Sequence, residues 1–296
     1  MKRFATLLQR EWMQHKRGWL ILLALPWVLV VGLGLFAGFQ IETDGKQPGV
    51  IAGTLMLTMA LTALTVLLAC GASLLMSPGL ARRDTQDRSI EFWVSLPSSH
   101  VHSIGATLLA HLIALPIAAV GVGALGGLLA SPVLAFQLWG LGEWAAIPWV
   151  PMLLTVFALV VRVAFGLMLA VLWLSPLILG TMAASAWLKR WGVPAVALTL
   201  GVGHGLLSKL YGLTFVGDTL RYLFIQAARA IIATADDGKE IKHFEEIDAL
   251  LPSLPAWFAQ DAGQAVLALA KPGFVAALVA GALMFGLLVL RRQRGS

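Results

Sequence analysis

Charged residues are scarce in this chain, and their scarcity excludes a soluble globular domain. Asp, Glu, Lys and Arg make up 12% of the 296 residues, whereas about 25% is typical of soluble domains. Apolar residues reach 59%, and the mean hydropathy is +0.85. This composition predicts an integral membrane protein.

Cysteine is nearly absent as well. Cys70 is the one cysteine and lies in an apolar run, which excludes an intrachain disulfide framework and a Cys-based metal site. The pI near 9.8 does not indicate nucleic-acid binding, because Lys and Arg are dispersed near helix ends and form no basic patch. Eleven Trp against two Tyr fit a protein with aromatic anchors at the membrane interface.

Long apolar runs predict how the chain crosses a membrane. A span needs about 20 apolar residues. Residues 1–17 alternate basic and apolar side chains, which predicts an amphipathic helix lying in the interface. The sequence therefore predicts an all-α membrane protein with a single transmembrane domain, 1–296, and six spans at about 18–40, 50–77, 104–131, 167–187, 192–212 and 272–290.

Two regions do not fit a simple pattern of spans. Residues 147–187 are apolar for twice the length of a span, and Arg162 interrupts them. We therefore expect 147–165 to form an external interfacial or re-entrant helix and 167–187 to cross. Residues 213–271 are more polar and predict a small external set of helices.

The distribution of Lys and Arg predicts the orientation. With six spans and a cytoplasmic N-terminus, the cytoplasmic segments are 1–17, 78–103, 188–191 and 291–296. They hold 13 of the 21 Lys and Arg and four of the 15 acids, a net charge of +9; the rest holds 8 and 11, a net of −3. Both termini are expected in the cytoplasm.

No set of residues in the sequence forms a convincing catalytic or cofactor-binding motif. The phosphate-binding pattern G-x-x-x-x-G-K-[ST] is absent, because the glycines of 201–209 have the wrong spacing. We expect those glycines, like Gly121, Gly123, Gly126 and Gly127, to let helices approach closely. The chain is expected to be no enzyme and to bind no cofactor.

Histidines and paired acids leave some chemistry open. His100 and His102 form a His-x-His pair, but no further ligand type lies near them in the sequence, so we expect no metal site. His111 and His204 lie in apolar segments; packing histidines bonded to a neighbouring helix are the commoner case, and a functional role is the alternative. Glu245-Glu246 lies in a polar stretch and lacks the context of a catalytic pair.

A short amphipathic segment, residues 84–99, separates two apolar runs. Ile90, Trp93 and Val94 share one helical face, and Pro97 ends the helix. It is either an interfacial helix resting on lipid or a docking element for a soluble partner.

The order of segments resembles the permease subunit of the type-2 ABC exporter family. The resemblance rests on the basic N-terminal helix, the number of spans, and a loop that ends Asp87-Arg88-Ser89-Ile90-Glu91-Phe92-Trp93-Val94-Ser95-Leu96-Pro97-Ser98-Ser99, where Ser98 replaces the usual Val. The stretches 172–176 and 185–190 are similar to the family's fourth span and its basic end.

The resemblance implies partners and a location. It implies two copies of an ABC ATPase subunit that bind ATP, a second permease subunit, identical or not, and a place among the lipids of a bacterial cytoplasmic (inner) membrane. It assigns ATPase docking to a cytoplasmic coupling helix between spans 2 and 3, whose residues here are Asp87, Arg88, Ile90, Glu91, Phe92, Trp93 and Leu96.

Two functions follow as alternatives. One is the transmembrane subunit of an ATP-driven exporter, which couples ATP hydrolysis to movement of a substrate out of the cytoplasm. The other is a non-transporting subunit that relays ATPase motion to an external protein partner through 213–271. The sequence identifies no substrate.

Overall fold

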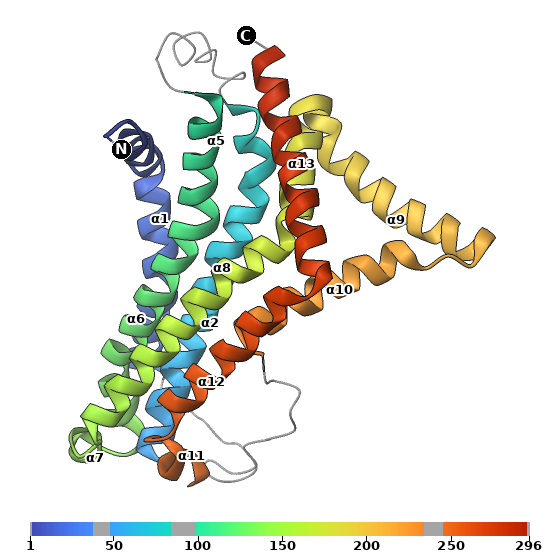
Figure 1. The fold of residues 1–296 in the computed structure, drawn as a ribbon. Coiled ribbons are helices and arrows are strands. Elements are labelled where there is room, and N and C mark those ends of the chain that lie inside the picture. The colour runs from blue at the N-terminus through green and yellow to red at the C-terminus, as the bar shows by residue number, and fades with distance from the viewer. Residues whose placement is uncertain (1, 38–47, 84–98, 234–244, 295–296) are drawn as a thin grey trace.

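The computed structural model describes residues 2–37, 48–83, 99–233 and 245–294, and every regular element within these ranges is a helix (Figure 1). The predicted all-α fold is confirmed for this part of the chain. The predicted docking residues, from Asp87 to Leu96, lie outside the described residues.

The first half of the chain forms three long helical elements packed along one another. α2 and α6 make the most intimate contact, and α1 packs against α6. The elements are α1 (Lys2–Ala37), α2 (Val50–Leu80), the continuous run of α5 (His100–Leu108), π-helix η1 (Leu109–Ala114) and α6 (Leu115–Leu138), and the short α7 (Leu141–Ala145).

Glycines set the distance between α2 and α6. A Cβ added at Gly127 would lie 2.4 Å from the Cα of Thr58, and one at Gly123 would lie 2.6 Å from the Cα of Thr62. The prediction that these glycines allow close approach is confirmed, as it is for Gly126, which faces the Trp27 ring. It is wrong for Gly121, which has open space around it.

Serine hydroxyls donate hydrogen bonds to the carbonyl oxygens that a proline leaves without a backbone partner. Ser77 Oγ donates to the carbonyl oxygen of Leu74 (2.9 Å), a group that Pro78 cannot bond because it has no N–H. The Ser131-Pro132 pair in α6 repeats the arrangement at 2.7 Å. Both helices therefore continue through their prolines.

α8 (Trp149–Leu188) corrects the expectation for the middle of the chain. It is one uninterrupted helix of 40 residues, about 60 Å long, and not an external segment followed by a separate span. Arg162 does not end it, because the side chain is buried against Asp261, with Nη2 2.6 Å from Oδ2. A charge that looked like a break in the sequence is neutralised within the fold.

Helices from the second half of the chain pack against α8. α10, α12 and α13 each contact α8, and their shared core includes Trp173, Leu223, Ala265 and Phe274. The predicted helices within 213–271 are present, but they share their core with the spans. The elements are η2 (Lys189–Trp191), α9 (Gly192–Tyr211), α10 (Phe215–Ile231), α11 (Glu245–Leu250), α12 (Leu254–Leu267), η3 (Ala268–Ala270) and α13 (Pro272–Arg294).

α9 and α10 project from the bundle and meet at a sharp turn (Figure 1). Gly192 is the one buried residue of α9, and Gly201, Gly203 and Gly205 have nothing within 4 Å. The expectation that these three glycines permit close helix contact is wrong within this chain.

α8 and α13 run parallel and side by side. Trp173 contacts Phe274 near the start of α13 (ring centroids 4.9 Å apart), and Arg291 Nε donates to the carbonyl oxygen of Ala186 (3.3 Å) near its end. Both termini lie at the same end of the molecule (Figure 1).

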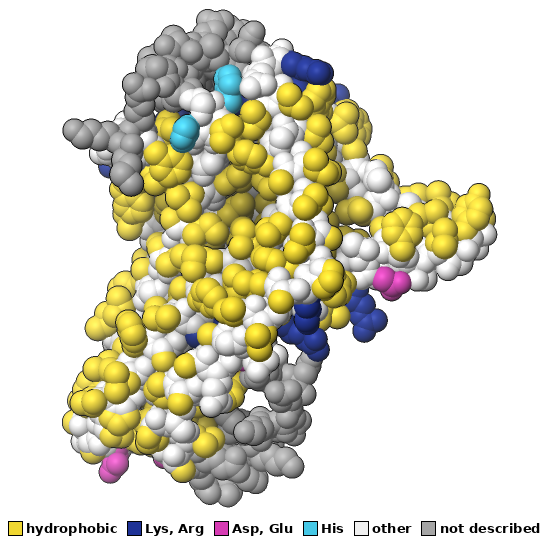
Figure 2. All heavy atoms as spheres, viewed as in Figure 1, with side chains coloured by type: hydrophobic (Ala, Val, Ile, Leu, Met, Phe, Trp, Pro, Cys, Tyr) yellow, Lys and Arg dark blue, Asp and Glu magenta, His cyan; other side chains and the backbone are white. Residues whose placement is uncertain are grey.

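Five helical runs among the described residues are long and apolar enough to cross a membrane, which is consistent with a multi-pass membrane protein. On the face in Figure 2, hydrophobic side chains cover most of the surface. Residues 2–37 form one helix, where an interfacial helix and a span were expected, and the two spans predicted at 167–187 and 192–212 fall in one run. The runs are Phe4–Phe36, Val50–Leu80, His100–Leu138, Trp149–Tyr211 and Pro272–Arg294.

Candidate functional site: a buried carboxylate that joins three helical elements

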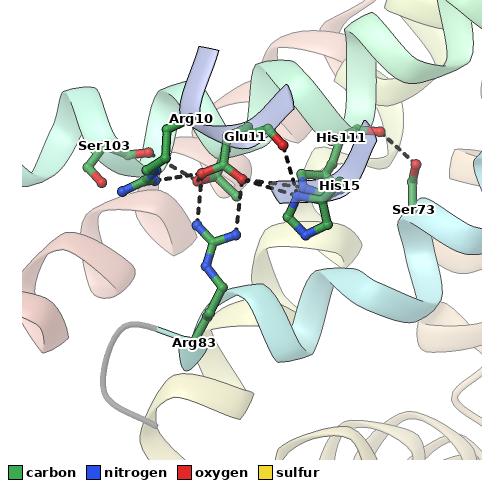
Figure 3. Close-up of polar contacts among 8 residues, drawn as sticks. Arg10, Glu11, His15, Ser73, Arg83, Ser103 and His111 are labelled. Carbon is green, nitrogen blue, oxygen red and sulfur yellow. Dashed lines mark hydrogen bonds and ion pairs between the residues drawn. The ribbon is translucent and has the colours of Figure 1, made fainter. Parts of the chain in front are cut away.

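Glu11 of α1 is fully buried and binds side chains from two other helical elements (Figure 3). We call the group the Glu11 cluster; it consists of Arg10, Glu11, His15, Arg83, Thr107 and His111. Arg83 lies three residues beyond Leu80, the last residue of α2, while Thr107 belongs to α5 and His111 to η1.

Arg83 makes the two-point contact of the cluster. Its Nη2 donates to Glu11 Oε1 (2.8 Å) and its Nη1 to Oε2 (3.0 Å), the fork-to-fork geometry in which guanidinium and carboxylate match best. Oε1 also accepts from Arg10 Nη2 (2.5 Å) and from the hydroxyl of Thr107 (3.0 Å). A carboxylate held by four donor groups from three elements fixes their relative positions.

Two histidines complete the cluster on the side of Oε2. The Nε2 of His111 lies 3.5 Å from this oxygen, and the Nδ1 of His15 lies 3.9 Å away. His15 Nδ1 donates to the backbone carbonyl oxygen of Glu11 (3.0 Å), which fixes that ring. The centroids of the two imidazole rings lie 4.6 Å apart in an edge-to-face arrangement, and both rings contact the Trp19 ring.

His111 lies in η1, the π-helical turn between α5 and α6. Such turns widen the helix by one residue and occur often at functional sites. The His111 carbonyl oxygen accepts a hydrogen bond from Ser73 Oγ of α2 (2.6 Å). The expected packing of this histidine is confirmed by its ring contacts with His15 and Trp19 of α1. The expected hydrogen bond from its side chain is not found within the described part of the chain, because neither ring nitrogen has a hydrogen-bond partner there and Nε2 lies 3.5 Å from the Glu11 carboxylate.

The cluster has the ligand types of a metal site but the wrong electrostatics for one. Ligand atoms of Glu11, His15 and His111 lie within 4.8 Å of one another, the one such group among the described residues. Arg10 and Arg83 already neutralise the carboxylate, and a divalent cation would add two positive charges beside two others. The arrangement suits mechanical connection better than metal binding.

The other histidines that the sequence singled out lie elsewhere. His102 is exposed, and its Nδ1 lies 2.5 Å from Ser99 Oγ at the start of α5. His204 belongs to α9, and its ring lies against Gly217 of α10. Neither belongs to the Glu11 cluster. The side chains of Glu245 and Glu246 lie outside the part of the chain that the structure describes.

Sequence reasoning missed Glu11 and Arg83, although a signal was present. Glu11 is the one acid among five basic residues in 1–17, and Arg82-Arg83 follows directly on the apolar run of α2. An isolated acid at the edge of an apolar helix needs a partner. The partner is 72 residues away, so spacing along the chain does not reveal it.

The cluster lies next to the segment that the sequence assigned to docking. Arg83 is the last described residue before 84–98, and Ser99, which caps α5, is the first after it. Both helices that flank the segment are thus tied to α1 through Glu11. No family model, curated protein or solved structure matches the chain.

Proposed function

We propose that this chain is the transmembrane subunit of an ATP-driven exporter of the type-2 ABC family. Two copies of a separate ATPase subunit bind and hydrolyse ATP, and a second permease subunit completes the pathway. The residues expected to dock the ATPase are Asp87, Arg88, Ile90, Glu91, Phe92, Trp93 and Leu96.

The observation that carries the proposal is the position of the Glu11 cluster. An ATPase that moves the segment 84–98 pulls on the end of α2 and on the start of α5 together, because the segment joins them. Arg83 and Thr107 pass that motion to Glu11 and so to α1. Motion of this segment therefore reaches three helical elements that are long and apolar enough to span a membrane.

The arrangement of the termini supports the proposed orientation. Both lie at the end of the molecule where α2 ends and α5 begins (Figure 1). The basic residues 291, 292 and 294 end α13 at the same place. With the positive-inside rule, this end faces the cytoplasm, where an ATPase would bind.

The alternative function, a relay to an external protein, is favoured by one observation. α9 and α10 form an arm that projects from the bundle, and α9 leaves most of its surface uncovered by this chain (Figure 1). An arm moved by α8 could act on another protein without a transported substrate.

The experiment is purification of the tagged full-length chain from its native membranes, with ATP hydrolysis measured in the purified complex. Truncating Trp93 to Ala removes a large docking side chain and costs about 2 kcal/mol, roughly a thirtyfold loss of affinity. Glu91→Lys should weaken docking through charge reversal. Phe136→Ala is the matched control, since this aromatic is 70% exposed at the far end of α6.

The proposal predicts that hydrolysis copurifies with the wild-type chain and the control and is lost with both docking variants. Equal hydrolysis in all four preparations would show that the segment does not dock an ATPase. Absence of hydrolysis from every preparation, at normal yield of the chain, would contradict the permease assignment itself.

A further inference from the structure

A cavity of about 190 Å³ lies where α8 and α12 run side by side, and α2 closes it from a third direction. Its walls include Met56 of α2, Leu159 and Val163 of α8, and Trp257 and Phe258 of α12. It is separate from the Glu11 cluster, and the proposed coupling makes no use of it.

The three polar side chains in the wall are already paired with other groups of the chain. Thr155 Oγ1 donates to the carbonyl oxygen of Leu251 (3.1 Å). Arg162 Nε donates to Asp261 Oδ2 (2.7 Å), and its Nη1 donates to the carbonyl oxygen of Ala230 (2.8 Å). A polar ligand would have to break these bonds, whereas an apolar one leaves them intact.

The cavity opens toward the outer surface of the helices. Three of its lining residues, Met59, Ile232 and Leu250, are 43%, 42% and 39% exposed, so the rim is accessible. Residues 55–59 lie about 8–14 Å along α2 from its first residue, a depth that falls within the hydrocarbon core if α2 spans the bilayer. At that depth the surrounding molecules are acyl chains.

The composition of the walls suits a flexible aliphatic chain. Met56 and Met59 have unbranched side chains that adapt to an irregular occupant. Apolar cavities of this kind exclude water and take up apolar molecules. We propose that the cavity binds the terminal part of one acyl chain of a membrane glycerophospholipid, which enters sideways from the bilayer past the exposed rim residues Met59 and Leu250.

The test uses the full-length chain in phosphatidylcholine nanodiscs that contain a phosphatidylcholine with a diazirine in one acyl chain. After irradiation, mass spectrometry maps the labelled residues. Label is expected on the cavity wall, at the buried Leu55 and Ile247 and at the half-buried Met56 and Trp257, as well as on Phe157, which is 67% exposed and serves as the internal reference.

Leu159→Trp fills the cavity and should lower labelling of the wall, relative to Phe157, by about tenfold, the loss expected when roughly two methylene groups are excluded. Val161→Trp, on the same helix with a side chain 51% exposed, is the matched control and should leave the ratio unchanged. Val163→Phe is a second, smaller filling variant for the case in which Leu159→Trp does not fold.

Two results would overturn the proposal. One is an equal ratio of wall to reference label in the wild type and in a folded filling variant. The other is labelling of the wall by a diazirine-bearing free fatty acid of the same length but not by the phospholipid, which would assign the cavity to a soluble fatty acid.

Discussion

Glu11 shows how one side chain can decide the arrangement of a helical fold. A carboxylate with no exposed surface is stable only if its charge is neutralised and its oxygens accept hydrogen bonds. Here the Arg83 guanidinium neutralises the charge and donates two hydrogen bonds, and Arg10 and Thr107 each donate one more. The same requirement explains Arg162, whose burial in α8 depends on Asp261.

At the residue scale we predict the effect of removing the Glu11 charge. Glu11→Gln leaves Arg83 and Arg10 beside a neutral amide, and breaking a buried pair in this way costs about 3–5 kcal/mol of folding free energy. The free energy of unfolding, measured by reversible denaturation of the full-length chain in detergent with Trp fluorescence, reports the change.

Glu143→Gln is the control for that variant. Glu143 is an exposed acid on α7, and its substitution should change the free energy of unfolding by less than about 0.5 kcal/mol. Equal effects of the two substitutions would mean that the Glu11 cluster contributes nothing to stability.

At the scale of elements, the contact between α2 and α6 depends on the absence of side chains. A methyl group at Gly127 would collide with the backbone of Thr58, which cannot turn aside as a side chain could. We predict that Gly127→Ala costs about 1–3 kcal/mol, because overpacking forces the two helices apart.

Gly121→Ala on the same helix should instead raise the free energy of unfolding. Its added methyl group meets nothing within 4 Å, and alanine favours the helix by up to about 1 kcal/mol over glycine. Unfolding midpoints of the two variants test the pair together. A shift in the same direction for both would contradict the packing argument.

Apolar runs, and some of the points where they begin, could be predicted from the sequence, because they reflect local composition. α2 and α13 begin where the sequence places them, at Val50 and Pro272. The continuity of α8 could not be predicted in this way. Arg162 reads as an interruption until its partner, 99 residues further along the chain, is known.

The same limit applies to the candidate site. The amphipathic segment 84–99 is visible as a pattern, whereas the Glu11 cluster joins residues 11, 83 and 107, whose proximity follows only from the packing of α1, α2 and α5. The sequence shows His111 as a polar residue in an apolar run, but it does not reveal that His111 lies in a π-helical turn.

At the scale of the whole molecule, the parallel packing of α8 and α13 predicts the topology. Because the two helices end together, the chain between them must return across the molecule, and α9 to α12 supply that return. Because α1 begins at the end of the molecule where α13 ends (Figure 1), reporters fused before Met1 and after Ser296 should lie on the same side, and the charge distribution makes it the cytoplasm. A reporter at Asp237 should lie outside.

If each of the five apolar runs crossed the membrane once, the two termini would lie on opposite sides of the membrane. Paired alkaline phosphatase and fluorescent-protein fusions distinguish the outcomes, and termini on opposite sides would exclude the return through α9 to α12.

The Glu11 cluster also predicts that docking and coupling can be separated. Arg83→Lys keeps the charge but loses the two-point contact with Glu11, since an ammonium group has no fork geometry. The docking segment 87–96 is unchanged in this variant. We therefore expect the ATPase to copurify at the wild-type level, while the change in its hydrolysis rate caused by the permease falls by at least about fivefold.

Three comparisons make this test decisive. Trp93→Ala should show the opposite pattern, with the ATPase lost. Arg190→Lys, an exposed basic residue beside Trp191, should behave as the wild type in both measurements. Glu11→Gln combined with Arg83→Lys should add little to either single variant, because both break the same contact. If Arg83→Lys retains full coupling, or loses the ATPase as Trp93→Ala does, motion of the segment 84–98 does not reach α1 through Glu11.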